Sequence, residues 1–334
     1  MKRPTIKDVA VLAGVSPSTV SRVLNGCHVG HMRPETKDRI LRVIKELEYT
    51  PVKAARVLRQ RRTQTIAVLL PDISNPFFAL FARGVESIAF VKGYSTMICD
   101  SNHSIQKESR YLDILLAEGV EGIIFIPVNQ PVMDRVQRLL RQGIKIIVAD
   151  RRVEGLPVVE ANNKEGSRKL TEYIIKLGYR KIAYIAGPAK VSTAEDRLKG
   201  FLEALTKAGL KPLDVRHGNF TYESGYEQAQ KIIQRYQVDA IMCGNDLMAI
   251  GAVRAAEDNG LRVPEDLGVT GFDHILWSDF LRPKLTTVEI PAFNMGQIAM
   301  RQFLKYDNKT CKLKVRIIRG ESCRKKRKGV YYAL

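Results

Sequence analysis

The apolar positions of this 334-residue chain change their spacing at about residue 63. Before that point they recur mostly three or four positions apart, which predicts short amphipathic helices. After it, short apolar runs alternate with longer amphipathic stretches, which predicts parallel strands alternating with helices. We therefore expect a small helical unit followed by a larger α/β body.

Two short helices around a tight turn are predicted near the start, over Thr5–Gly26 (TIKDVAVLAGVSPSTVSRVLNG). Thr5 can cap the first helix, and Gly14 can adopt the positive φ at which such a helix ends. Ser16 is a suitable N-cap for the second helix, and Pro17 suits its first position. A third helix is predicted over residues 34–47. The residues expected to face the shared core are Val9, Ala10, Ala13, Val20, Val23, Leu24, Ile40, Leu41, Ile44 and Leu47.

The outward face of the second helix carries small polar and basic side chains that have no core to enter. A helix-turn-helix presents such a face to the major groove and reads bases from the N-terminal end of its second helix. The residues of this unit expected to contact DNA are Thr5, Ser16, Pro17, Ser18, Thr19, Ser21, Arg22, Asn25 and Arg33. Any two-helix hairpin with a glycine turn shares part of this pattern, but the cap, the proline, the hydroxyl run and the basic setting together favour DNA binding.

The larger body is predicted to contain two series of strands and helices. The strands are expected at 65–70, 95–99, 122–126 and 145–149, and then at 181–186, 216–219, 240–243 and 268–271. The helices are expected at 77–92, 104–118, 132–142, 163–177, 196–208, 223–236 and 247–259. The fold class is therefore α/β, with two doubly wound parallel-sheet lobes after the helical headpiece. Because ligands bind beyond the carboxyl ends of such strands, facing lobes would form one cleft.

The net charge of +19 is concentrated at the two ends of the chain. Residues 1–62 hold 14 Lys and Arg against 5 Asp and Glu, and residues 301–334 hold 12 against 2. The residues between them are neutral. Charge confined to the ends around a neutral body indicates a dedicated polyanion-binding end. The run Arg324–Lys328 (RKKRK) is expected to be a solvated charge run, with an accessory DNA contact as the alternative.

The cysteines and the start of the chain indicate a cytoplasmic protein. The five cysteines lie far apart without a C-x-x-C pair, so neither a zinc site nor a disulfide framework is expected, and no cofactor is expected either. The first residues, MKRPTIKD, have no apolar core of a secretory signal. No apolar run approaches the ~20 residues that span a membrane, so no membrane partner is expected.

The pattern D-V-A-x-x-A-G-V-S-x-x-T-V-S-R-V-L-N, from Asp8 to Asn25, resembles the headpiece signature of the lactose and galactose repressor family of bacterial regulators. The resemblance extends to about Ser322 and implies a type I periplasmic-binding-protein-like body. It implies a headpiece over residues 1–48, a hinge helix or linker over 49–62 and a two-lobed effector-binding and dimerisation domain over 63–323. A basic tail over 324–334 is left unexplained.

The resemblance also implies a role for the segment between headpiece and body. Pro51, Ala54, Ala55 and Leu58 match the family pattern of a hinge helix that orders only on DNA. Leu58 would be the wedge inserted into the minor groove, and Ala55 would also lie against the DNA. The five basic residues of the segment and the adjoining turn would repel one another in a free helix, so a plain linker is the alternative.

Asp, Asn, Arg and Phe recur where the predicted strands of the body end. Sugar hydroxyls both donate and accept hydrogen bonds, and sugar C–H faces pack on aromatic rings, so this mixture favours a sugar ligand. The residues expected to contact the ligand are Asn75, Phe77, Phe78, Asp150, Arg151, Arg197, Phe220, Asn245, Asp273 and Glu289. The resemblance implies that nine of them correspond to pentose-contacting residues of ribose-binding proteins, whereas Glu289 stands where those proteins carry glutamine. Asp72 and Asp246 are interpreted as caps or turn residues.

These patterns predict a sequence-specific repressor of sugar-utilisation genes. It would bind a pseudo-palindromic operator as a homodimer and be released by a pentose such as ribose. A purine effector is the alternative within the family, but purine-responsive members stack the base on an aromatic residue where this chain has Arg151. An enzyme that uses Asp150 and Asp273 as paired carboxylates is the alternative of another class, although both residues already have a role in binding.

Overall fold

The computed structural model describes residues 4–24, 32–49, 63–129, 133–307 and 309–326. It divides near residue 63 into two compact units, each with its own core. The predicted DNA contacts Asn25, Ala55 and Leu58 lie outside the described residues, as does the hinge segment from residue 50 to 62.

The first unit, called the headpiece below, consists of α1 (Ile6–Leu12), α2 (Pro17–Leu24) and α3 (Pro34–Glu46). Gly14 adopts the predicted positive φ, +61°, and so allows the chain to turn after α1. The buried apolar residues are Val9, Ala10, Ala13, Val20, Val23, Ile40, Val43 and Tyr49. The prediction that Leu41 faces the core is wrong, because its side chain is 44% exposed. Val43, three residues after Ile40, takes that place, whereas Leu41 lies about 100° around the helix.

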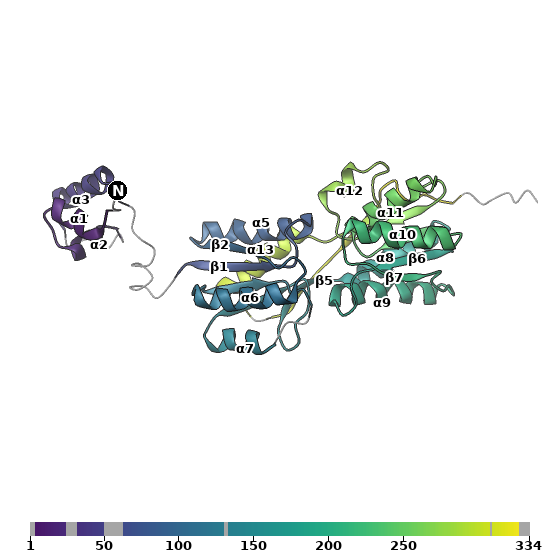
Figure 1. Ribbon diagram of the computed structural model, residues 1–334, viewed down its shortest axis with the longest axis horizontal. Coiled ribbons are helices and arrows are strands. Elements are labelled where there is room, and N and C mark those ends of the chain that lie inside the picture. The colour runs from purple at the N-terminus through teal and green to yellow at the C-terminus, as the bar shows by residue number, and fades with distance from the viewer. Residues whose placement is uncertain (1–3, 25–31, 50–62, 130–132, 308, 327–334) are drawn as a thin grey trace, which may run out of the picture. The chain divides into compact units, whose positions relative to one another are not determined.

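The first lobe of the second unit is built on a six-stranded parallel sheet of order β11-β5-β4-β3-β1-β2. Its strands are β1 (Thr65–Leu70), β2 (Ser95–Asp100), β3 (Gly122–Phe125), β4 (Lys145–Ala149), β5 (Val158–Ala161) and β11 (Cys311–Leu313). Its helices are α5 (Pro76–Val91), α6 (Ile105–Ala117), α7 (Met133–Arg141) and α13 (Ala292–Lys305). Alternate residues of β1 point to opposite faces: Ile66 packs with residues of α5 and α13, and Ala67 with residues of α6 and α7. Helices α5 and α13 accordingly lie on one side of this sheet, and α6 and α7 on the other (Figure 1).

The second lobe is built on a four-stranded parallel sheet of order β7-β6-β8-β9. Its strands are β6 (Ile182–Ala186), β7 (Val215–His217), β8 (Ala240–Cys243) and β9 (Gly268–Thr270). Its helices are α8 (Asn163–Lys176), α9 (Ser192–Lys207), α10 (Tyr222–Arg235), α11 (Asp246–Asp258) and the short α12 (Leu276–Phe280). Helices α8 and α9 cover one face of the sheet, and α10 and α11 the other. The prediction of two doubly wound lobes is confirmed.

Three crossings of the chain between the lobes were not predicted. After β5 the chain enters the second lobe at α8, and it returns to the first lobe for α13 and β11. It then crosses again to form β12 (Arg316–Ile318), which pairs antiparallel with β10 (Thr287–Glu289). The last part of the chain therefore completes both lobes rather than trailing behind the second.

The predicted solvated tail is anchored where it is described. Arg324 forms an ion pair with Glu265, and Lys326 forms one with Asp239. The Lys326 amide also donates to the Leu177 carbonyl at 2.8 Å. Both side chains remain solvated, 54% and 36% exposed, but carboxylates of the second lobe pair with them, so these two charges are partly neutralised.

Helices α5 and α13 cross at two glycines, and because these have no side chain, the two backbones come into direct contact there. A Cβ on Gly296 would lie 2.1 Å from the Phe81 carbonyl oxygen, and one on Gly84 would lie 2.1 Å from the Phe293 carbonyl oxygen. We expect Gly296→Ala to lower the free energy of unfolding by about 1–3 kcal/mol, because neither backbone can yield without shifting a helix. Urea unfolding measures this, with Asn294→Ala on the exposed side of α13 as the control. Equal stabilities for the two variants would contradict the expectation.

No helix in the described part of the chain combines the length and the apolar character that a membrane span requires.

Candidate functional site

The N-terminus of α2 is surrounded by hydroxyl groups. Ser16 is its N-cap, since its Oγ accepts a hydrogen bond from the Thr19 amide at 3.2 Å. The same oxygen lies 2.7 Å from Ser18 Oγ and 2.8 Å from Thr19 Oγ1. At the start of α1, the Asp8 carboxylate accepts hydrogen bonds from both the amide and the hydroxyl of Thr5. The sequence therefore sets the helix start and the polar face with the same residues.

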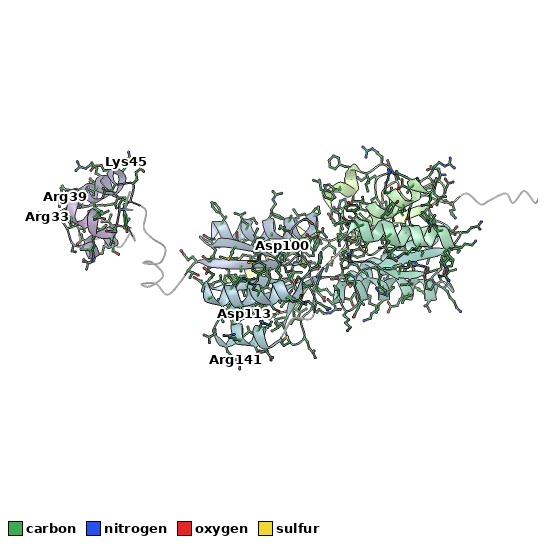
Figure 2. The ribbon with its side chains drawn as sticks, viewed as in Figure 1. Arg33, Arg39, Lys45, Asp100, Asp113 and Arg141 are labelled. Carbon is green, nitrogen blue, oxygen red and sulfur yellow. The ribbon has the colours of Figure 1, made fainter. Side chains whose placement is uncertain are left out.

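The face predicted to read DNA is assembled and accessible. Ser18 and Arg22 are exposed on α2, while Val20 and Val23 on its other side are buried in the headpiece core. Pro17 is also exposed, and Thr19 and Ser21 are half-buried. Arg33, Arg39 and Lys45 extend from the headpiece surface (Figure 2). Cations of this kind suit phosphate contacts, and the hydroxyls and Arg22 suit base edges.

A pocket in the second unit gathers nine of the ten residues predicted to contact the ligand, all of them in the described part of the chain. The first lobe contributes Asn75, Phe77, Phe78, Asp150 and Arg151. The second lobe contributes Arg197, Phe220, Asn245 and Asp273, together with Thr193, which was not predicted. All ten lining residues are buried.

Two asparagines at the pocket are also helix caps. Asn75 Oδ1 accepts from the Phe77 amide at the start of α5, and Asn245 Oδ1 accepts from the Met248 amide at the start of α11, both at 3.0 Å. Asn245 Nδ2 donates to the Phe220 carbonyl at 2.9 Å. Capping and pocket lining are thus compatible roles, because the carboxyl ends of parallel strands lead directly into helix N-termini.

The two arginines are held by different sets of contacts. Arg197 donates to the Asn163 side chain and the Gly244 carbonyl, and its Nη2 lies 2.9 Å from Asp273 Oδ1. Arg151 Nη1 donates to two backbone carbonyls of the loop after β3, both at 2.9 Å. Its guanidinium carbon lies 5.6 Å and 5.9 Å from the ring centroids of Phe78 and Phe220. These contacts fix both cations at the pocket wall.

Three buried polar atoms of this pocket make no hydrogen bond with any described residue: Asp150 Oδ1, Arg151 Nε and Asp273 Oδ1. Asp150 faces Arg151 at 3.8 Å, which is too long for a hydrogen bond, and Asp273 faces Arg197 as an ion pair without hydrogen-bond geometry. Burial raises the pKa of Asp150, although both arginines oppose it. A buried polar group without a partner is costly and calls for an explanation. A ligand rich in hydroxyls would satisfy all three.

The backbone at the pocket is strained. Asp150, Phe220 and Asp273 have positive φ values of 59°, 70° and 109°. Residues other than glycine adopt this region at a cost of about 1–3 kcal/mol each, and they cluster at functional sites. The strained conformations occur at the ends of β4 and β9 and before α10, so they determine how these side chains enter the pocket.

The pocket is small and adjoins a larger compartment. The free volume between its ten lining residues is about 20 Å³, which is room for about one water molecule. A compartment of about 330 Å³ shares Arg151 with the pocket and is lined also by His103, Ile105, Val128, Asn129, Pro188, Val191 and Asn219. A ligand larger than a water molecule could therefore enter only if the lobes separated or the lining side chains moved.

Other predicted residues lie outside the pocket. Glu289, predicted to contact the ligand, does not line it: its carboxylate pairs with Arg316, because β10 and β12 are antiparallel neighbours. Asp72 accepts from the Ser74 amide and hydroxyl, which confirms it as a turn residue. Asp246 accepts from Ile275, Ser278 and Thr287 and thus anchors the chain after β9 rather than the ligand.

Thr193 was missed because the start of its helix was predicted too late. The predicted helix began at residue 196, but α9 begins at Ser192, and Thr193 lies in its first turn. The signal was present in the sequence, since Ser and Thr are common at helix starts. Within the described residues no group of three His, Cys, Asp or Glu side chains is placed to hold a metal ion.

The unusual pKa of Asp273 predicts a pH-dependent stability difference. Burial raises its pKa from 3.8 to about 7, although Arg197 opposes this. Between these values the folded protein holds a proton that the unfolded chain has released, so this contribution to stability is full below about pH 4 and is lost by about pH 7. Asp273→Asn should therefore gain stability relative to the parent protein as the pH rises through this range, by an amount on the order of 1 kcal/mol or more. Urea unfolding from pH 4 to 8 measures this gain, and a difference independent of pH would contradict it.

Two family descriptions match the chain in sequence. Residues 5–52 match bacterial regulatory proteins of the lacI family. Residues 63–319 match the periplasmic binding proteins and sugar binding domain of the LacI family. The ribose operon repressor of Halalkalibacterium halodurans is 37% identical over 303 residues, covering 90% of this chain and 89% of that repressor.

Solved structures match the fold over most of the chain. The lac repressor dimer bound to operator and the anti-inducer ONPF has a TM-score of 0.86 and 26% identity, covering 96% of this chain and 99% of that chain. A LacI family transcriptional regulator from Enterococcus faecium with bound ribose has a TM-score of 0.72 and 27% identity, covering 79% and 100%. The similar proteins are regulators of transcription rather than enzymes.

Proposed function

The chain belongs to the LacI family of bacterial transcriptional regulators, and we propose that it represses sugar-utilisation genes and leaves its operator when a pentose such as ribose binds between its lobes. The observation that supports the effector class is that three buried polar atoms of one pocket, on Asp150, Arg151 and Asp273, make no hydrogen bond within the described residues. In that part of the chain, Asp273 Oδ1 is held only by its ion pair with Arg197. The three atoms belong to two lobes, so a single ligand would join the lobes.

The chemistry of the pocket supports a small sugar. Carboxylates accept hydrogen bonds from hydroxyls, and guanidinium groups donate to them, so these atoms suit adjacent hydroxyls of one ring. Phe77, Phe78 and Phe220 supply apolar walls for its C–H faces. A solved relative of this fold holds ribose, and a relative similar over nine-tenths of the chain is a ribose operon repressor.

A purine is the competing effector. Arg151 occupies the place where an aromatic platform would be needed, and it is tied to the loop after β3 by two hydrogen bonds. The paired carboxylates Asp150 and Asp273 have a role as hydroxyl acceptors, so they do not imply hydrolysis. Both considerations favour binding of an intact sugar.

Exposed apolar side chains of the second unit supply surfaces for a second copy of the chain. Phe90 and Val91 at the end of α5 are 76% and 77% exposed, and Ile98 on the edge strand β2 is also exposed. Trp277 and Phe280 on α12 form a second group. Apolar groups of this kind mark interaction surfaces, and the lac repressor neighbour is a dimer on its operator. A homodimer would place two headpieces on a pseudo-palindromic site.

Release of DNA by sugar requires only that the sugar binds one arrangement of the lobes better than the other. The small free volume of the pocket fits a change in the lobe arrangement when a sugar enters, as an alternative to movement of the arginine side chains alone. If the sugar-bound arrangement cannot hold both headpieces on the operator, ribose lowers the affinity for DNA.

The test has two stages. Duplexes selected from a random pool by the purified full chain identify an operator, and gel-shift titration then measures its affinity with and without D-ribose. We expect ribose to raise the melting temperature by mass action and to weaken operator binding. Tighter operator binding would show co-repression instead, and stabilisation by hypoxanthine or guanine but not by any pentose would overturn the proposed effector. Recovery of unchanged ribose after incubation checks that no enzymatic reaction occurs.

A further inference from the structure

Glu108 is a buried acid just outside the pocket that the proposed function leaves unused. It lies in the first turn of α6 and is 1% exposed. Its Oε2 accepts a hydrogen bond from the Val128 amide at 2.6 Å. Burial raises the pKa of Glu108 to about 7, opposed by this hydrogen bond and by the charge of Arg151. A buried carboxyl group is costly, so its position beside the pocket needs a reason.

The segment that Glu108 holds is the segment that holds Arg151. Arg151 Nη1 donates to the carbonyls of Pro127 and Val128, each at 2.9 Å. The Val128 carbonyl therefore accepts a hydrogen bond from Arg151, and the Val128 amide donates one to Glu108. The connection runs from α6 through one loop peptide to the pocket.

Arg151 lines both the pocket and the larger compartment, and Val128 lines the larger compartment. A shift of the Pro127–Val128 segment would therefore move the Arg151 guanidinium relative to Phe78 and Phe220. Arg151 Nε is the unpartnered donor in the pocket, and its direction depends on how Nη1 is held.

We propose that Glu108 is a positioning residue for the effector site: it fixes the Pro127–Val128 peptide and thereby the direction of the Arg151 guanidinium. The proposal rests on the proposed function only in that Arg151 is a ligand contact. Glu108 itself does not touch the ligand.

The first test compares D-ribose affinity among variants of the full chain by calorimetry. Glu108→Ala should weaken binding about tenfold or more, because the loop peptide and Arg151 lose their support. Glu108→Gln keeps an acceptor for the Val128 amide and should recover most of that loss. Glu160→Ala is the matched control, since Glu160 is a buried acid of the same lobe that pairs with Arg152 outside the pocket; its affinity should stay within about twofold of the parent.

A double-mutant cycle separates positioning from a general effect on the fold. In an Arg151→Met background, Glu108→Ala should cause no further loss of ribose affinity, because the residue through which it acts is gone. The same factor of weakening in both backgrounds would overturn the proposal, as would a Glu108→Ala variant with unchanged affinity.

A measurement without ligand keeps the proposal independent of the identity of the effector. The Arg151 guanidinium ¹⁵N–¹H resonance, assigned by its absence in Arg151→Met, should shift in Glu108→Ala and stay in place in Glu160→Ala. An unshifted resonance in Glu108→Ala would overturn the positioning role. Absence of ribose binding by the parent protein would instead refute the proposed function, and the resonance would still decide the role of Glu108.

Discussion

Removal of residues 1–62 should lower the affinity for the operator at least ~10³-fold while leaving D-ribose affinity within about twofold. The headpiece has a core of its own, and the described residues of the second unit bury three separate apolar clusters that do not include it. The truncated protein should therefore fold and bind sugar. Residues 1–62 carry 14 Lys and Arg, so the phosphate contacts would be lost together with the base contacts. Gel-shift titration and calorimetry on the two proteins measure both affinities.

Point variants show whether this loss arises from the face of α2. Arg22→Ala in the full chain should weaken operator binding about 10- to 100-fold and relax base preference, because Arg22 lies on the exposed hydroxyl-rich face. Lys45→Ala, at the end of α3, is the control; we expect a change of a few fold that is equal for all sequences (Figure 2). A truncated protein that retains specific operator binding would refute the assignment of the headpiece.

The parts of the fold that were predictable are those in which the residues of one element, taken alone, indicate whether that element is buried. Buried parallel strands are apolar on both faces, so the run Thr65–Leu70 was recognisable without knowledge of its neighbours. Asn75 and Asn245 were recognisable as candidate ligand contacts, and the structure places both at the pocket, where they also cap α5 and α11. In these cases the type of residue is enough to indicate where it lies in the folded protein.

The chain crossings were not predictable from the strands that make them. β5 and β11 contain only 4 and 3 residues, and a glutamate or a lysine interrupts each of them. They pair with each other across about 150 residues of sequence, and only the tertiary structure brings them together. Helix α13 is different, because Met295, Ala299 and Phe303 recur at intervals of four residues and are buried. The sequence alone therefore carries a helix signal at α13.

The residues of the site likewise divide into those that a local sequence pattern indicates and those whose partners are distant in the sequence. Glu289 stands at a family ligand position where the ribose-binding relatives carry glutamine, but its partner Arg316 lies 27 residues away on β12, and only the antiparallel pairing shows that the two form an ion pair. Glu108 could have been noticed, because it shares one helix face with Leu112 and Leu115, and all three are buried. An acidic residue on an apolar helix face is either a buried carboxyl group with hydrogen-bond partners or a functional residue. Sequence alone could not identify Val128 as its partner.

Asp150→Asn should weaken D-ribose binding about 10- to 100-fold while making the ligand-free protein more stable. Asp150 is buried, its Oδ1 has no hydrogen-bond partner among the described residues, and burial raises its pKa, so its carboxylate destabilises the ligand-free fold. Asparagine has the same shape and tolerates the positive φ of this position, so the backbone need not change. The loss of affinity follows because a charged acceptor for sugar hydroxyls is replaced by a neutral amide. Calorimetry with ribose and thermal unfolding without it measure the two effects.

Asp246→Asn provides the contrast that makes this prediction specific. Asp246 is also a buried carboxyl group of raised pKa, about 6, but it accepts hydrogen bonds from Ile275, Ser278 and Thr287 and lies outside the pocket lining. Its replacement should lower stability and change ribose affinity only a few fold, which is the opposite pattern. In the full chain, Asp150→Asn should also give a repressor that stays on its operator at ribose concentrations that release the parent, because the sugar can then bias the lobes only weakly. If Asp150→Asn lost stability and kept its affinity, Asp150 would be a structural residue, and the pocket would have to bind its effector through other groups.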